Sequence, residues 1–214
     1  MMQISAERMD VDAERGGALS MVRPGAGIDL GAAEHAVRDL LVALGQDSAE
    51  ANLRDTPRRV AAVYRELLTP KPFNLTTFPN EEGYDQLIIA RSIRFTSLCA
   101  HHLLPFTGVA SVGYLPKERI LGLSKLARVV ESFARGLQLQ ERMTSQIATW
   151  LLEQLMPKGV GVLLEAEHLC MTIRGVQQPG TTTVTSALLG SVRNDLRTRQ
   201  EFLTLAHTAG GSGA

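Results

Sequence analysis

The sequence predicts an α+β domain in which an antiparallel four-stranded sheet carries a pair of helices on one face, preceded by N-terminal helices. Three observations lead to this fold class. The apolar residues change period along the chain, from helical to alternating and back, in the order ββααββ. A short stretch with Pro105 separates the first two strand-like segments, which is typical of an antiparallel pair. The 214 residues, 44% of them hydrophobic, are enough to bury one sizeable core.

The N-terminal elements are predicted to be two helices. From Asp29 to Leu44 the apolar side chains recur at helical spacing. A second helix begins within "DTPRRVAAVYRELL", with Thr56 as its N-cap and Pro57 at the first helical position, where the missing N–H costs nothing.

The core elements follow in the order ββααββ, with one more helix at the end. They are strands at 86–99 and 107–116, helices at about 124–135 and 139–156, strands at 160–174 and 181–189, and a last helix at about 195–206. Side chains alternate along a strand, so the strand 160–174 is expected to place His168, Cys170 and Arg174 on one face. A four-stranded sheet has two open edges that can pair with other copies, so we expect an oligomer.

The chain is predicted to form one domain with two flanking segments. The domain covers 27–207, with the N-terminal helices in 27–70 and the core in 84–207. Residues 1–26 are expected to be a disordered arm and residues 208–214 a flexible tail, because neither has a sustained apolar pattern.

Composition and charge exclude several classes of partner. The 22 basic and 22 acidic side chains leave no overall field for nucleic acid or for an anionic membrane. The start, "MMQISAERMDVDAERGG", lacks the basic and apolar regions of a secretory signal, so we expect a cytoplasmic protein. In that reducing compartment, two cysteines that each lie near a histidine favour metal ligands or nucleophiles over a disulfide.

Both cysteines and three of the five histidines fall into two short clusters. In "SLCAHHLLPF", Cys99 and His102 are close enough in sequence to bind one zinc ion at roughly 2.0 to 2.3 Å. With Cys170 they would provide three protein ligands and an open fourth position, as in catalytic zinc sites. His101 and His168 would then remain as acid–base groups beside the metal.

Two other interpretations of these clusters stay open at this point. Free cysteines often pack as small hydrophobic side chains, and histidines often make structural hydrogen bonds. A structural zinc would need a fourth ligand, for which His35, His207 or a carboxylate is available.

Polar residues at the starts of the two core helices indicate an anion site and a base-binding site. Ser124 begins the first of these helices, and Lys125 and Arg128 lie on one face, where cations and a helix N-terminus can hold phosphate oxygens. Gln140 and Glu141 begin the next helix, where a carboxylate that accepts two N–H bonds could hold the edge of a guanine. Solvent-exposed basic residues and simple helix capping are the alternatives.

With these pieces in order, the chain resembles GTP cyclohydrolase I from about residue 35 to 206. The matching stretches are "LRDTPRRVA", "SLCAHHLLPF", "VGYLP", "GLSKLARVVE", "LQLQERMTSQIA", "GVLLEAEHLCMTIRG", "TVTSALLG" and "TRQEFL". The resemblance implies a tunnelling fold, in which ββααββ subunits join edge to edge into a pentameric ring. It also implies a homodecamer of two stacked rings, with the sites between subunits.

The resemblance implies a zinc-dependent hydrolysis of GTP, which opens the imidazole ring at C8, releases formate and forms 7,8-dihydroneopterin triphosphate. The zinc ligands it implies are Cys99, His102 and Cys170, the proton-transfer groups are His101 and His168, and Ser124 acts after ring opening. The triphosphate contacts it implies are Lys125, Arg128 and Arg174, with Arg59 from a neighbouring subunit, and the guanine is held by Gln140 and Glu141.

One residue departs from the family pattern. The family has Cys-Glu-His-His where this chain has Ala100 between Cys99 and His101. A carboxylate at that place would orient the neighbouring imidazoles and stabilise their charged forms. Two alternatives therefore accompany the main interpretation: a paralogue with a partial reaction or another purine nucleotide as substrate, and a non-catalytic nucleotide-binding scaffold.

Overall fold

The computed structural model describes residues 19–20, 27–47 and 50–207. Most of the predicted arm (1–26) and the whole predicted tail (208–214) therefore lie outside the described residues. The N-terminal elements are β1 (Leu19–Ser20), α1 (Leu30–Ala43), α2 (Thr56–Leu68), β2 (Asn74–Leu75) and β3 (Thr77–Pro79). The core elements are β4 (Ile88–Cys99), β5 (Pro105–Leu115), β6 (Arg119–Leu121), α3 (Leu123–Ala134), β7 (Leu137–Gln138), α4 (Gln140–Leu155), β8 (Gly159–His168), α5 (Leu169–Thr172), β9 (Thr182–Gly190), α6 (Ser191–Asn194) and α7 (Leu196–His207).

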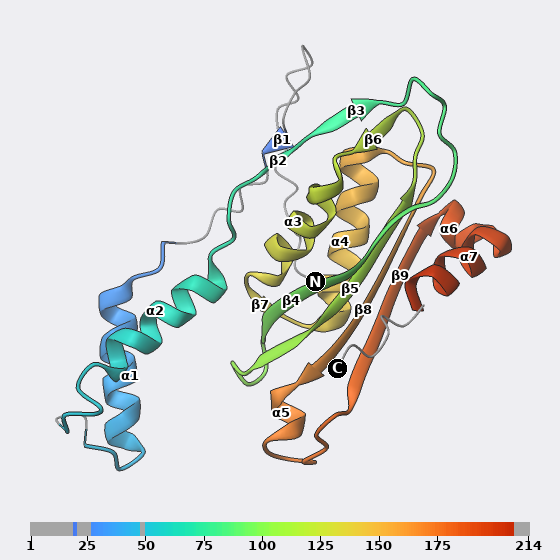
Figure 1. Cartoon of the computed structure of the whole chain (residues 1–214). Coiled ribbons are helices and arrows are strands. Elements are labelled where there is room, and N and C mark those ends of the chain that lie inside the picture. The colour runs from blue at the N-terminus through green and yellow to red at the C-terminus, as the bar shows by residue number, and fades with distance from the viewer. Residues whose placement is uncertain (1–18, 21–26, 48–49, 208–214) are drawn as a thin grey trace, which may run out of the picture.

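The main sheet has the strand order β7-β4-β5-β8-β9 (Figure 1). The four long strands are antiparallel, which confirms the predicted four-stranded sheet. β7 adds a fifth strand of two residues, which pairs parallel to β4 at Leu98 and Cys99. Two small pairs flank this sheet: β1 with β2, and β3 with β6.

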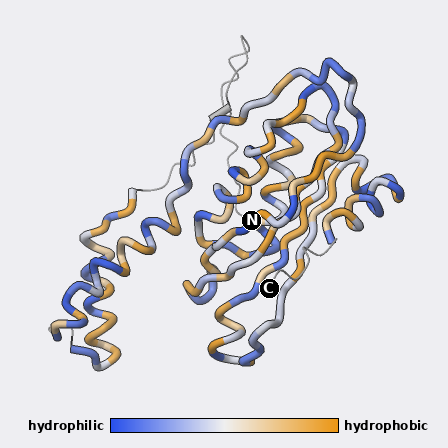
Figure 2. Tube along the Cα trace, in the orientation of Figure 1, coloured by the Kyte–Doolittle hydropathy of each residue, from blue (hydrophilic) through white to orange (hydrophobic). Residues whose placement is uncertain are grey.

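The helices α3 and α4 pack on one face of the sheet, as predicted, and their buried apolar residues form one cluster with those of the strands. Figure 2 shows hydrophobic stretches on both the helices and the strands of this layer pair. Successive side chains of β8 point to opposite faces, and both faces are covered over residues 159–164, which are all buried. Val160, Val162 and Leu164 face the helix pair and are fully buried, with exposed fractions of 0%. Among the described residues, every helix is too short or too polar to cross a lipid bilayer.

The C-terminal helices pack with the side chains of β8 that alternate with this buried set. Val192 of α6 and Phe202 of α7 form a second apolar cluster with Leu87 and Leu163. Gly161 makes this packing possible, because a Cβ at that position would lie 2.7 Å from the Phe202 ring. The long helices and the C-terminal helices therefore use alternate residues of one strand.

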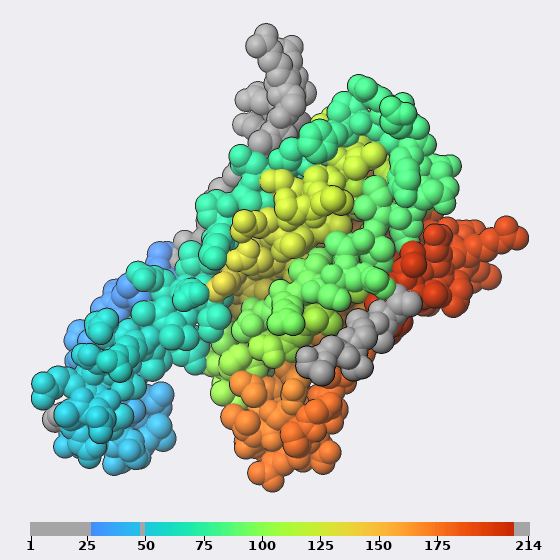
Figure 3. Space-filling view, viewed as in Figure 1, coloured from blue at the N-terminus to red at the C-terminus, as the bar shows by residue number. Residues whose placement is uncertain are grey.

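The N-terminal helices form a pair that extends away from the sheet (Figures 1 and 3). The carboxylate of Asp29 caps α1 by accepting a hydrogen bond from the Ala32 N–H at 2.9 Å. In α2 the N-cap is Asp55 rather than the predicted Thr56, which is already helical. α2 is tied to the core by the Arg135 guanidinium, which donates to the Glu66 carbonyl at 2.7 Å.

The predicted strand 160–174 ends earlier than expected, at His168. Both neighbouring strands stop pairing with β8 at this point. The last pair with β5 is Phe106 and His168, and the last pair with β9 is Thr182 and Glu167. Backbone groups without a ladder partner must bond elsewhere, and here they form the short helix α5. The prediction that Cys170 and Arg174 share a strand face with His168 is therefore wrong, since both follow the strand.

Candidate metal and nucleotide site

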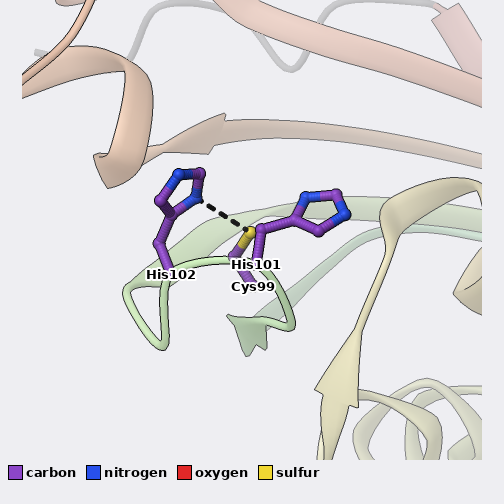
Figure 4. A group of neighbouring side chains, drawn as sticks. All are labelled: Cys99, His101 and His102. Atoms are coloured by element: carbon purple, nitrogen blue, oxygen red, sulfur yellow. Dashed lines mark hydrogen bonds between the residues drawn. The ribbon is translucent and has the colours of Figure 1, made fainter.

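A tight turn between β4 and β5 holds the first cluster. The carbonyl of Cys99 accepts hydrogen bonds from the N–H groups of His102 (3.3 Å) and Leu103 (2.9 Å). Leu103 adopts the left-handed conformation, with φ of 56°, which closes the turn. The His102 ring turns toward the Cys99 sulfur, with Nδ1 3.9 Å from Sγ (Figure 4).

The short helix α5 brings the second cluster to the same place. One potential ligand atom from each of Cys99, His168 and Cys170 lies within 4.8 Å of the others, and the same holds for Cys99, His101 and His102. Cys99 belongs to both groups and is buried, whereas His101 and His102 are exposed. The structure therefore places the predicted ligands His102 and Cys170 each near Cys99, although the three do not form one group within 4.8 Å.

The chemistry of these donors fits a zinc ion. Thiolate sulfur and imidazole nitrogen are the ligands that zinc prefers in proteins, and magnesium or calcium would instead require oxygen donors. Burial raises the pKa of the Cys170 thiol, and the neighbouring Cys99 thiol raises it further, while Arg174 opposes the shift. The thiol of Cys170 must therefore lose its proton when it binds a metal ion.

His168 lies at the end of β8 in a well-defined environment. Its ring stacks on Phe106, with ring centroids 4.6 Å apart and planes 3° apart. Its Nε2 lies 2.8 Å from the Oε1 atom of Gln140, the first residue of α4. Burial lowers the pKa of His168, and the Glu141 carboxylate opposes the shift, so the structure favours a neutral imidazole.

A cavity of about 210 Å³ adjoins the cluster and is lined by Cys99, His101, Gln138, Leu139, Gln140, Glu141, His168, Cys170, Met171 and Thr183. Glu141 is exposed at the N-terminus of α4, whereas Gln140 is buried, with an exposed fraction of 2%. Ligand pockets usually enclose roughly 300 to 1,000 Å³. The cavity of a single chain therefore has room for only part of a nucleotide.

Two of the predicted phosphate residues, Ser124 and Lys125, lie at the start of α3, away from the metal cluster. β6, which leads into α3, contacts Tyr114, whose partner in β4 is Ile88. Cys99 ends β4 at its opposite end, where the last residue of α3, Ala134, accepts a hydrogen bond from Ser97, so Ser124 lies about 15 Å from there along the helix axis. One chain therefore does not bring Ser124 or Lys125 to the metal cluster.

Arg128 and Arg59 are both exposed and paired with nearby acids. Arg128 lies 3.4 Å from Glu131 and lines a groove of about 600 Å³ beside β4, which also contains Arg91, Arg94 and Arg135. Arg59 lies on α2, 3.4 Å from Asp55. Exposed ion pairs of this kind are weak and exchange readily for another anion.

Ala100 takes part in the site through its backbone. Its N–H donates to the Gln138 carbonyl at 3.0 Å, which fastens the turn to β7. Because this bond uses no side chain, the turn is held in place without the glutamate of the family pattern.

The sequence reasoning missed three residues that shape the site. The Tyr64 hydroxyl on α2 donates a hydrogen bond to the Leu103 carbonyl at 3.2 Å. Phe106 stacks on the His168 ring, and Thr183 lines the cavity beside it. Phe106 stands in the quoted motif, but its position opposite His168 depends on strand register. Nothing in the sequence distinguishes Tyr64 from the other residues of its amphipathic helix.

A family model and the relatives similar in sequence indicate one family. A family model described as GTP cyclohydrolase I matches residues 33–207. The protein named GTP cyclohydrolase 1 from Aquifex aeolicus (strain VF5) is 47% identical over 178 residues, which are 83% of this chain and 97% of the relative. The protein of the same name from Streptomyces avermitilis is 49% identical over 178 residues, which are 81% of this chain and 88% of the relative.

A solved structure titled as the archaeosine synthase QueF-Like in the apo form covers 49% of this chain and 93% of its own. Its TM-score of 0.41 and identity of 18% are too low to support any statement about this chain.

Proposed function

The chain belongs to the GTP cyclohydrolase I family, a family of enzymes, and on that premise we propose that it hydrolyses GTP with the help of a bound zinc ion. The reaction consumes one water overall, opens the imidazole ring at C8, releases formate and forms 7,8-dihydroneopterin triphosphate. The observation that carries this proposal is the meeting of Cys99, Cys170 and His168, from two distant segments, within 4.8 Å.

The residues that would hold zinc are Cys99, His102 and Cys170. The chemistry that the ion supplies when bound is Lewis acidity, which makes water a stronger nucleophile at neutral pH. His101 and His168 would move protons to and from the opening ring, because both line the cavity beside the thiols. The carboxylate of Glu141 would hold the N1 and exocyclic amine edge of the guanine.

The triphosphate would be bound by residues from more than one chain. Arg174 follows α5 and influences Cys170 directly, so it belongs to the same chain as the metal cluster. Ser124 and Lys125 lie at the start of α3, away from the cluster, Arg128 lines the groove beside β4, and Arg59 lies on the projecting α2, so we propose that neighbouring copies supply these four residues. Binding of the remote triphosphate would position C8 for the reaction.

The sheet provides the edges that such an assembly needs. In the described part of the chain, β4 pairs with β7 only at Leu98 and Cys99, and the outer edge of β9 has no partner strand. Edges of this kind pair readily with another copy. We propose a ring closed by edge-to-edge contacts, and a homodecamer of two pentameric rings is the assembly that the family resemblance implies.

The proposal is tested by incubating the purified, zinc-loaded chain with GTP. We expect formate release together with a product that, after oxidation, has the absorbance and fluorescence of a pterin. Formate without pterin would indicate that the reaction stops at the ring-opened stage. If GTP binds and neither product forms, the chain is a nucleotide-binding scaffold and the proposal is wrong.

A further inference from the structure

The side-chain amide of Gln140 is enclosed by protein groups that determine its orientation. Its Nε2 lies 2.8 Å from the Thr183 carbonyl oxygen, 3.2 Å from the Leu164 carbonyl oxygen and 3.1 Å from the Thr185 hydroxyl. Carbonyl oxygens only accept hydrogen bonds, so the group that faces them must be the NH₂ of the amide. The amide oxygen of Gln140 therefore points the other way, toward His168.

This orientation determines where His168 carries its proton. Oε1 of Gln140 is 2.8 Å from Nε2 of His168, and an amide oxygen can only accept. Nε2 must therefore be the protonated nitrogen of the neutral imidazole, which leaves the lone pair on Nδ1. A half-turn of the ring would put a carbon atom against the amide oxygen, and the stacked Phe106 ring holds the ring plane.

Two threonines extend the network behind Gln140. The Thr144 hydroxyl donates to the backbone carbonyl of Gln140 at 2.7 Å, and the hydroxyls of Thr144 and Thr185 lie 2.7 Å apart. Since the Thr144 proton is used on Gln140, the Thr185 hydroxyl donates to Thr144 and accepts from the amide. The hydrogen bonds thus run in one direction, from the side-chain NH₂ of Gln140 through Thr185 and Thr144 to the backbone carbonyl of Gln140, and they support this orientation of the amide.

We propose that Gln140 is a positioning residue, which holds His168 as its Nε2–H tautomer and leaves Nδ1 as the acceptor for proton transfer. This inference rests on the proposed function, because that function gives His168 its role. It differs from the guanine contact predicted for the Gln140 side chain, since the amide already bonds to protein groups on both sides. Glu141, exposed at the cavity, remains the residue for the guanine.

The two roles of Gln140 predict different kinetics. For a positioning residue, Gln140→Leu should lower kcat by about 10- to 100-fold, as loss of such supporting hydrogen bonds usually does. The Kd for GTP, measured by calorimetry on the metal-free full chain, should change by less than about twofold because no substrate contact is lost. For a guanine contact, the Kd would rise at least about tenfold because a ligand hydrogen bond is removed.

A second variant tests the network without touching the cavity. Thr185→Val removes one acceptor of the amide and should lower kcat in the same direction but less than Gln140→Leu. Thr182→Val is the matched control on the same strand, because its hydroxyl donates to Glu165 and not to Gln140. Control and wild type should have equal kcat, and an equal loss in both threonine variants would overturn the inference.

The tautomer itself is read by magic-angle-spinning NMR on ¹⁵N-histidine-labelled protein, with the His168 signals assigned from their loss in His168→Gln. We expect a protonated Nε2 and an unprotonated Nδ1 in the wild type, and a mixture of tautomers in Gln140→Leu. A protonated Nδ1 in the wild type would overturn the inference whatever the activity. A wild type that releases no formate would instead refute the proposed function and leave the tautomer result standing.

Discussion

Cys99 lies at the centre of the candidate site, because its buried thiol is near His102 on its own turn and near Cys170 on α5. The sequence indicated Cys99 and His102 together, since a C-x-x-H spacing keeps two ligands close in any compact turn. It could not show that the chain between β8 and β9 folds back as α5, and this turn is what brings Cys170 to the cluster.

We predict that Cys170→Ser removes both the metal ion and the turnover. A serine hydroxyl is a poor zinc ligand compared with a thiolate, and the remaining two ligands hold the ion weakly. Metal content by mass spectrometry after dialysis should fall well below one zinc per chain, and formate release should be lost. An active Cys170→Ser variant that contains no metal would contradict the proposed zinc-dependent reaction.

Tyr114 provides a prediction about stability and pH. Its side chain is fully buried, and its hydroxyl accepts a hydrogen bond from the Leu121 N–H at 2.7 Å. Burial raises the pKa of Tyr114 above its ordinary value of 10.0, and the bond from Leu121 opposes the shift. Because the folded state then holds this proton more tightly than the unfolded state, its contribution to stability is complete below pH 10 and is lost as the pH rises above it.

At pH 7 we expect Tyr114→Phe to lower the free energy of unfolding by about 1–3 kcal/mol, because the Leu121 N–H loses its partner. Above pH 10 the difference in unfolding free energy between wild type and variant should shrink. Unfolding of the wild type then releases the Tyr114 proton, which favours the unfolded state, and phenylalanine has no such proton. Urea unfolding from pH 7 to 11 at one protein concentration measures this. A difference that stays constant over the whole range would show that Tyr114 keeps an ordinary pKa.

At the scale of elements, β8 connects the core with the site. Its inward residues pack on the helix pair, its other face packs on α7, and its last residue is His168. Periodicity predicted the strand and its apolar face, because alternation is a local property. It overextended the strand, because the end of a strand depends on where its neighbours stop.

Gly161 allows α7 to lie against the sheet, and we predict that Gly161→Ala is destabilising. The new Cβ would lie 2.7 Å from a fully buried Phe202 ring, and such overpacking costs about 1–3 kcal/mol. Gly136→Ala is the matched control, because a Cβ there meets nothing within 4 Å. Chemical denaturation should separate the two variants.

Adding Phe202→Leu to Gly161→Ala should recover part of the stability, because the smaller side chain leaves room for the new methyl group. If Gly161→Ala were as stable as the Gly136→Ala control, the close packing of α7 on β8 would not hold in solution.

At the scale of the whole molecule, the metal cluster and the N-terminus of α3 lie apart within a single chain. Ala134, at the end of α3, accepts a hydrogen bond from Ser97 near the cluster, while Ser124 lies about 15 Å away along the helix axis. If neighbouring chains share the sites, two inactive variants can restore each other. Cys170→Ser damages the cluster, and Lys125→Ala combined with Arg128→Ala damages the predicted phosphate residues.

Co-expression of the two inactive chains should produce mixed rings in which about a quarter of the sites combine two undamaged halves, if chains assort at random. Formate release should recover to a similar fraction of the wild-type rate. A mixture of the separately purified variants, without exchange of subunits, is the control and should stay inactive. No recovery in mixed rings of confirmed composition would show that each site is built within one chain.

The sequence by itself determined the order of elements, the inward faces of α3 and α4, and the chemistry of the clusters, because periodicity and short spacings depend on neighbouring residues. Only the tertiary structure decided the end of β8, the approach of Cys170 to Cys99, and the distance between α3 and the metal cluster. It also decided that the Gln140 amide bonds to His168. These features depend on strand register and on packing between segments far apart in the chain, and no local pattern of residues encodes either of them.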